Sequence, residues 1–151
     1  MNLRGRWGAI VLATGLAVTG CTLGAGENAT PAANSRAEAQ STLAALQAAQ
    51  RDALDLWARL IAGEDVSCAQ AITLPPPITG QASAPPAQQV IDRLSEARSA
   101  LEQSAARWDL ECASAGDVVG LGAARVGQGA ARQATEPLQS AESLLAAWPL
   151  P

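Results

Sequence analysis

The chain has 151 residues, with ten arginines against fourteen acidic residues and a formal net charge of −4 at neutral pH. It contains no histidine, lysine, phenylalanine or tyrosine. Without histidine, the chain has no Ser–His or Cys–His catalytic pair and no histidine ligand for a metal. An acidic chain with scattered arginines also lacks the concentrated positive face that nucleic acid binding requires, so we expect no nucleic acid partner.

The first twenty residues have the organisation of an export signal. Arg4 and Arg6 form a positively charged start, and residues 7–18 form an apolar run that is too short to span a bilayer as a stable helix. A Val-Thr-Gly-Cys sequence follows and ends at Cys21. This order of charge, apolar length, small residues and cysteine resembles the lipobox of bacterial lipoprotein precursors, and the resemblance covers residues 1–21 only.

The resemblance implies that the signal peptide, residues 1–20, is removed and that the sulfur of Cys21 carries fatty acyl chains such as palmitate. Each buried methylene contributes about 0.8 kcal/mol, so two or three acyl chains hold a protein stably on a membrane. Eight arginines and fourteen acidic residues remain after cleavage, a net charge of −6. Because an acidic surface is repelled by anionic headgroups, we expect the lipid to make the membrane contact. The expected location is extracytoplasmic, either at the cell surface or facing the periplasm.

The chain from residue 21 onward divides into a tether and one domain. Residues 21–34 are rich in Gly, Ala, Asn and Thr and contain almost no large apolar residue, which is typical of a flexible tether. Residues 35–151 are long enough to bury a core of their own, and their patterns are helical.

The first helix is predicted over residues 35–62. It begins with a serine–glutamate capping box at Ser35, and Gly63 is placed to end it. Asp55 and Arg59 have the i,i+4 spacing of an ion pair. Apolar residues recur every three or four positions at Leu43, Leu46, Ala53, Leu54, Trp57, Leu60 and Ile61.

A proline-rich segment, residues 66–86, separates this helix from a second one predicted over residues 86–115. Three consecutive prolines at 75–77 keep the segment extended, as a stiff crossover or, alternatively, as a ligand for a groove-type recognition domain. Charged residues occupy one face of the second helix, which is typical of a solvated surface. Its apolar stripe consists of Ala87, Ile91, Leu94, Ala97, Leu101, Ala105, Trp108 and Cys112.

The third helix is predicted over residues 117–148, although four glycines near its start resemble a loop in composition. The spacing favours a helix, because small and apolar residues alternate by four and three without interruption. We expect a bend where Glu136-Pro137 breaks the hydrogen-bond ladder. The positions are Gly120, Ala124, Gly127, Ala131, Ala134, Leu138, Ala141, Leu145 and Trp148.

Cys68 and Cys112 remain once Cys21 is committed to lipid, and an even pair in an oxidising compartment predicts a disulfide. In a simple hairpin the two sulfurs would lie about 35–40 Å apart along the second helix. The bond therefore requires the first two helices to run parallel, joined by the long crossover. We predict an all-α domain, a three-helix bundle closed by this disulfide, with Trp57 and Trp108 at the disulfide end and Trp148 at the other.

No reaction is indicated by the residues of this domain. Two thiolates are too few for a zinc site, and the carboxylates decorate the polar faces of helices. The tryptophans lie on apolar stripes, where a core position is favoured over a sugar-binding platform. We expect a lipoprotein with no catalytic, metal or cofactor site that binds a protein or polymer of the cell envelope or supports an assembly there. The alternative is a carrier of a small apolar ligand.

Overall fold

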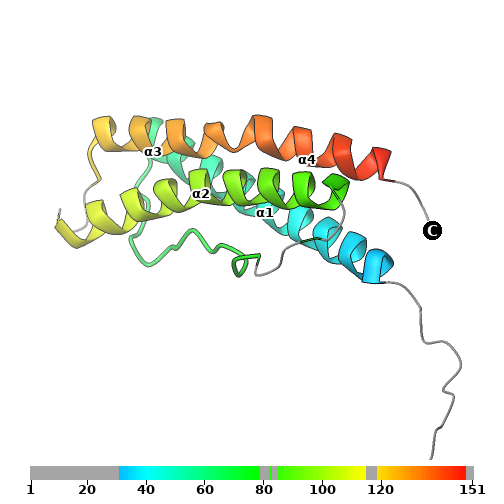
Figure 1. Cartoon of the computed structure of the whole chain (residues 1–151). Helices are drawn as coiled ribbons and strands as arrows, with labels where there is room; N and C mark the ends of the chain where they lie inside the picture. The colour runs from blue at the N-terminus through cyan, green and yellow to red at the C-terminus, as the bar shows by residue number, and fades with distance from the viewer. Residues whose placement is uncertain (1–30, 79–81, 83–84, 115–118, 149–151) are drawn as a thin grey trace, which may run out of the picture.

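The computed structural model describes residues 31–78, 82, 85–114 and 119–148. The predicted export signal, Cys21 and the predicted tether up to residue 30 lie outside these residues. All regular structure in the described part is α-helical, which confirms the predicted all-α class. The helices are α1 (Pro31–Ile61), α2 (Pro85–Ser114), α3 (Leu121–Gln133) and α4 (Thr135–Ala147) (Figure 1).

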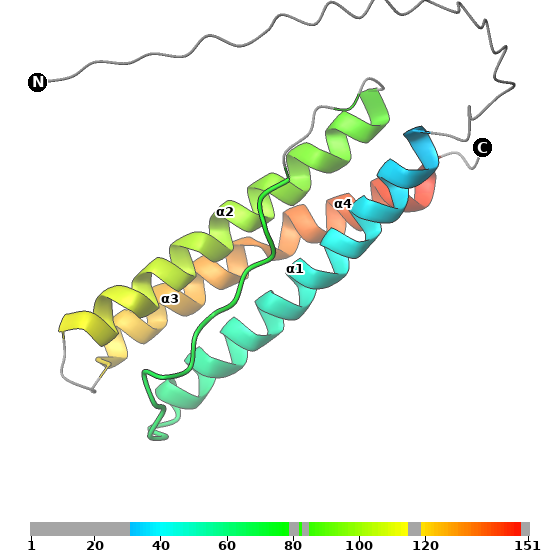
Figure 2. The same ribbon diagram turned by 90° about the horizontal axis from the view of Figure 1, so that it is seen from below.

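The helices pack lengthwise against one another. α1 and α2 run in the same direction, whereas α3 and α4 follow each other and return in the opposite direction (Figures 1 and 2). The segment after α1 passes along the side of α1 and α2 that faces away from α3 and α4. Its half-buried Ile72, Leu74 and Ile78 pack against the core, so this segment contributes apolar contacts of its own.

α1 begins at Pro31 rather than at Ser35, so the last four residues assigned to the tether are helical. Proline is favoured in the first helical turn, because its missing N–H would have no partner there and its φ angle already suits a helix. The two alanines that follow have the highest helix propensity of any residue. Composition assigned residues 31–34 wrongly to the tether, because it does not register helix propensity.

The C-terminus of α1 is closed by Gly63, as predicted. Gly63 has a φ of +81°, a left-handed conformation that glycine adopts without steric cost. Its N–H donates to the carbonyl of Leu60 and the N–H of Glu64 donates to that of Arg59, both at 3.0 Å, which is a Schellman cap. The predicted Asp55–Arg59 ion pair is wrong: this turn brings Glu64 back toward the helix, and Arg59 pairs with it at 2.9 Å.

The predicted third helix is divided into α3 and α4 at Ala134. Pro137 has no N–H to donate to Gln133, and its ring excludes that carbonyl from the normal helical position. The N–H of Ala134 bonds to the carbonyl of Ala131, three residues back, at 3.3 Å, and the ladder resumes from Leu138 to Ala134 at 3.1 Å. The interruption therefore lies one turn before the proline.

The small-residue register of this helix pair was predicted correctly over most of its length. The exception is Gly120, which is exposed and precedes the first turn of α3. Asp117, the predicted start, lies outside the described residues. The buried positions of the register are Ala124, Gly127, Ala131, Ala134, Leu138, Ala141 and Leu145.

The core consists of two clusters of buried side chains. The larger one is built from leucines, alanines and Val90 of all four helices, with half-buried Trp148 packed against it. The smaller one contains Trp57 and Trp108, with the half-buried cysteines Cys68 and Cys112 beside them. Trp57 and Trp108 therefore share the disulfide cluster, as predicted, and Trp148 belongs to the other.

Candidate functional site

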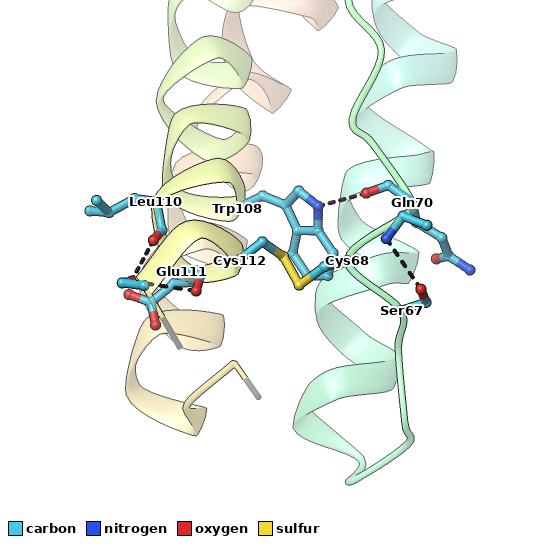
Figure 3. Close-up of a disulfide and its surroundings, with 9 residues drawn as sticks. Ser67, Cys68, Gln70, Trp108, Leu110, Glu111 and Cys112 are labelled. Atoms are coloured by element: carbon cyan, nitrogen blue, oxygen red, sulfur yellow. Dashed lines mark hydrogen bonds between the residues drawn. A yellow bond between two sulfur atoms is a disulfide. The ribbon is translucent and has the colours of Figure 1, made fainter. Parts of the chain in front are cut away.

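The disulfide between Cys68 and Cys112 is formed, with an S–S distance of 2.03 Å and a Cα–Cα distance of 5.6 Å. Figure 3 shows that it links the segment after α1 to the last turns of α2, with Trp108 next to it. The indole N–H of Trp108 donates to the carbonyl of Gln70 at 2.6 Å. Two neighbouring contacts, one covalent and one polar, therefore fix this segment to α2.

A buried polar node joins three helices beside the disulfide. The indole N–H of Trp57 in α1 donates to the hydroxyl of Ser104 in α2 at 2.8 Å. That hydroxyl donates in turn to the carbonyl of Gly127 in α3 at 3.0 Å. Trp57 also meets Trp108 edge to face, with ring centroids 5.5 Å apart and an interplanar angle of 78°. Both rings are at most 1% exposed, so they fill the core and offer no surface to a ligand.

Apolar periodicity does not identify Ser104 as a core residue, because its hydroxyl makes it polar by composition. The available signal was its position, three residues after Leu101 and four before Trp108, in the middle of the predicted stripe. The role of Gly127 is also specific. A methyl group there would overlap two atoms of the Trp57 ring and lie 2.8 Å from a third, Cη2.

A shallow groove of about 260 Å³ lies between the first half of α1 and the second half of α4. Arg36 is at one side of it, and its Nη2 donates to the carbonyl of Leu145 at 3.1 Å, where a cation is favoured by the helix dipole. The Nε and Nη1 atoms of Arg36 are buried without a hydrogen-bond partner among the residues described. The groove is lined by Arg36, Gln40, Leu43, Ala44, Gln47, Glu142, Leu145 and Ala146.

The surface of α3 that faces solvent carries two of the three exposed large apolar side chains among the described residues, and the third is Leu110 of α2. Leu121 and Val126 are 55% and 61% exposed, and both are large apolar side chains. A Cβ atom at Gly122 or Gly129 would meet no atom within 4 Å. We call this surface the outer face of α3 and define it by six of the seven exposed residues of this helix, without Gln133 at its end: Leu121, Gly122, Arg125, Val126, Gly129 and Arg132.

The charged surface of α2 provides the contrast. It carries three ion pairs within the one helix, of which Arg93–Glu96 is the first. Its charges are therefore largely balanced by neighbours on the same helix. α3 contains two arginines and no acidic residue. Its outer face is therefore apolar and basic in a chain that is acidic as a whole. The remaining ion pairs of α2 are Arg98–Glu102 and Arg107–Glu111.

Two searches of the residues that the structure describes found no candidate, one for metal-binding clusters and one for membrane-spanning helices. These residues contain no group of three or more His, Cys, Asp or Glu side chains arranged to hold a metal ion. None of their helices combines the length and the hydropathy needed to cross a membrane. No protein family model matches the chain, and neither a curated protein nor a solved structure matches it significantly.

Proposed function

We propose that the protein is a lipid-anchored, extracytoplasmic lipoprotein without catalytic activity, whose three-helix bundle binds a protein or polymer of the cell envelope. The export signal ending at Cys21 supports the anchor. The Cys68–Cys112 disulfide supports an oxidising location, because such bonds persist outside the cytoplasm.

The observation that carries the binding role is the outer face of α3, with its two large apolar side chains exposed to solvent. Exposed apolar surface that is bordered by polar residues can mark an interaction site. The position of α3 supports the same role. α1 has 31 residues and is therefore about 45 Å long, and α3 begins near the C-terminal end of α1 (Figure 2). A domain anchored through the N-terminal end of α1 would present α3 away from the membrane.

Site-specific photo-crosslinking in living cells tests this role. A photoreactive amino acid in place of Val126 is expected to capture a specific partner. The same amino acid at Gln103, an exposed position on α2, is the matched control and is expected to capture less. If neither position, nor any other exposed position of the domain, yields a crosslinked species, the binding role is contradicted.

The groove between α1 and α4 favours a second candidate function, the transport of a small apolar ligand. Leu43, Ala44, Leu145 and Ala146 supply apolar lining, and Arg36 supplies a cation at its side. Native mass spectrometry of protein extracted from membranes tests this candidate. A carrier is expected to retain a ligand or to be stabilised by one according to RT ln(1 + [L]/Kd). A ligand-free mass, with no stabilisation by any apolar compound, would contradict it.

A further inference from the structure

The outer face of α3 has features that specify the chemistry of its partner, an inference that rests on the binding role proposed above. Leu121 and Val126 are exposed, whereas the buried residues of α3 are all small: Ala123, Ala124, Gly127 and Ala131. A purely anionic polymer would leave these two side chains without an apolar contact. The face therefore requires a partner that supplies apolar surface, as a protein does.

The two glycines of this face indicate how close the partner comes. A glycine inside a helix makes that helix less stable than an alanine would, by about 1 kcal/mol. Gly127 is explained by the ring of Trp57, but nothing within 4 Å explains Gly122 or Gly129. These two lie seven residues apart, so they stand two turns from each other on one side of α3, with Val126 between them. Because glycine has no side chain, two glycines on one side of a helix allow the backbone of another helix to approach closely.

Charge distinguishes a foreign partner from a second copy of this chain. Arg125 and Arg132 are also seven residues apart, and α3 has no acidic residue to balance them. Two copies meeting through this face would bring four arginines together, and like charges at an interface cost several kcal/mol. An acidic partner would bind more tightly because of the same two arginines, since guanidinium groups bind carboxylates in a bidentate manner.

We propose that the outer face of α3 binds an acidic amphipathic helix of a partner protein. The small and apolar side chains of the partner helix lie over Gly122, Val126 and Gly129. The carboxylates of the partner helix, spaced seven residues apart, meet Arg125 and Arg132. The partner helix lies along α3, because the two glycines and the two arginines of this face are each spaced along the axis of α3.

The test uses the full-length lipidated protein in cells, with the photoreactive amino acid at Val126 and mass spectrometric identification of the crosslinked peptide. We expect a peptide with acidic residues at heptad spacing. Arg125→Glu is expected to reduce the capture about tenfold or more, since it turns an attraction into a repulsion. Arg51→Glu makes the same change of charge at an exposed position of α1 and is expected to leave the capture unchanged. Exchanging the captured carboxylate of the partner for arginine is expected to restore binding to the Arg125→Glu variant.

The other outcomes overturn the inference in distinguishable ways. Capture at Gln103 but not at Val126 would leave the binding role standing and refute the outer face of α3 as its site. A captured second copy, a captured polymer or a peptide without acidic residues would refute the acidic helix. An Arg51→Glu effect equal to that of Arg125→Glu would show a general charge effect and refute the specific contact. No capture at any exposed position would refute both this inference and the binding role.

Discussion

Gly127→Ala tests whether the close contact between α3 and Trp57 organises the disulfide end of the domain. On helix propensity alone, the substitution would stabilise α3 by about 1 kcal/mol. The structure predicts the opposite sign, because the added methyl group would overlap the ring of Trp57, which is fully buried. Trp108 lies edge to face against this ring and restricts its movement.

The size of the change in the free energy of unfolding follows from the core contacts that the added methyl group disturbs. Overpacking of a core by one methyl group costs about 1–3 kcal/mol. A shift of Trp57 away from α3 also strains its 2.8 Å hydrogen bond to Ser104, and an unsatisfied buried donor costs about 1–3 kcal/mol. After the gain in helix propensity is subtracted, we expect Gly127→Ala to lower the free energy of unfolding by about 1–5 kcal/mol.

Equilibrium urea unfolding, followed by circular dichroism and tryptophan fluorescence, measures this change. Gly129→Ala is the matched control, because it lies in the same helix and its added methyl group meets nothing. We expect this control to raise the free energy of unfolding by about 0.5–1 kcal/mol. If Gly127→Ala were as stable as Gly129→Ala, the contact between α3 and Trp57 would not exist as described.

Three further substitutions test other parts of the domain by the same unfolding measurement. Ser104→Ala leaves a buried indole N–H without its acceptor and should lower the free energy of unfolding by about 1–3 kcal/mol, whereas a loss equally large for exposed Ser99→Ala would refute the buried node. Replacing both Cys68 and Cys112 by serine should cost up to about 4 kcal/mol, because the bond closes a loop with a sequence separation of 44; an unchanged unfolding curve would mean that the bond adds no stability. Gln50→Leu removes two hydrogen bonds to the α3–α4 junction and should cost about 1–2 kcal/mol with faster amide exchange there; unchanged exchange would contradict that role.

Sequence patterns predicted the helices because their signals are local. Apolar spacing located part of each buried stripe, but it missed Val90, which is fully buried beside the half-buried Ile91 of the predicted stripe. Gly63 marked the end of α1, and both ends of α2 were placed within one residue. The disulfide followed from the count of cysteines once Cys21 was assigned to lipid. Each of these inferences needs only neighbouring residues or simple arithmetic, so each could be made without coordinates.

The features that the sequence did not reveal depend on contacts between helices. Ser104 is polar by composition, and its burial is possible only because Trp57 donates to it from α1 and Gly127 accepts from it in α3. The pairing of Arg59 with Glu64 instead of Asp55 depends on the path of the chain after Gly63. Glycine occurs on both sides of α3, and only the packing distinguishes buried Gly127 from exposed Gly122 and Gly129.

The intact mass of the protein extracted from the membranes of its own cells tests the central claim most directly. The measurement is made with and without reduction before alkylation. A lipid-anchored, disulfide-closed domain predicts a chain that begins at an acylated Cys21, with Cys68 and Cys112 alkylated only after reduction. An unmodified Cys21 would contradict the anchor, and alkylation of Cys68 and Cys112 without reduction would contradict the closed domain in its native compartment.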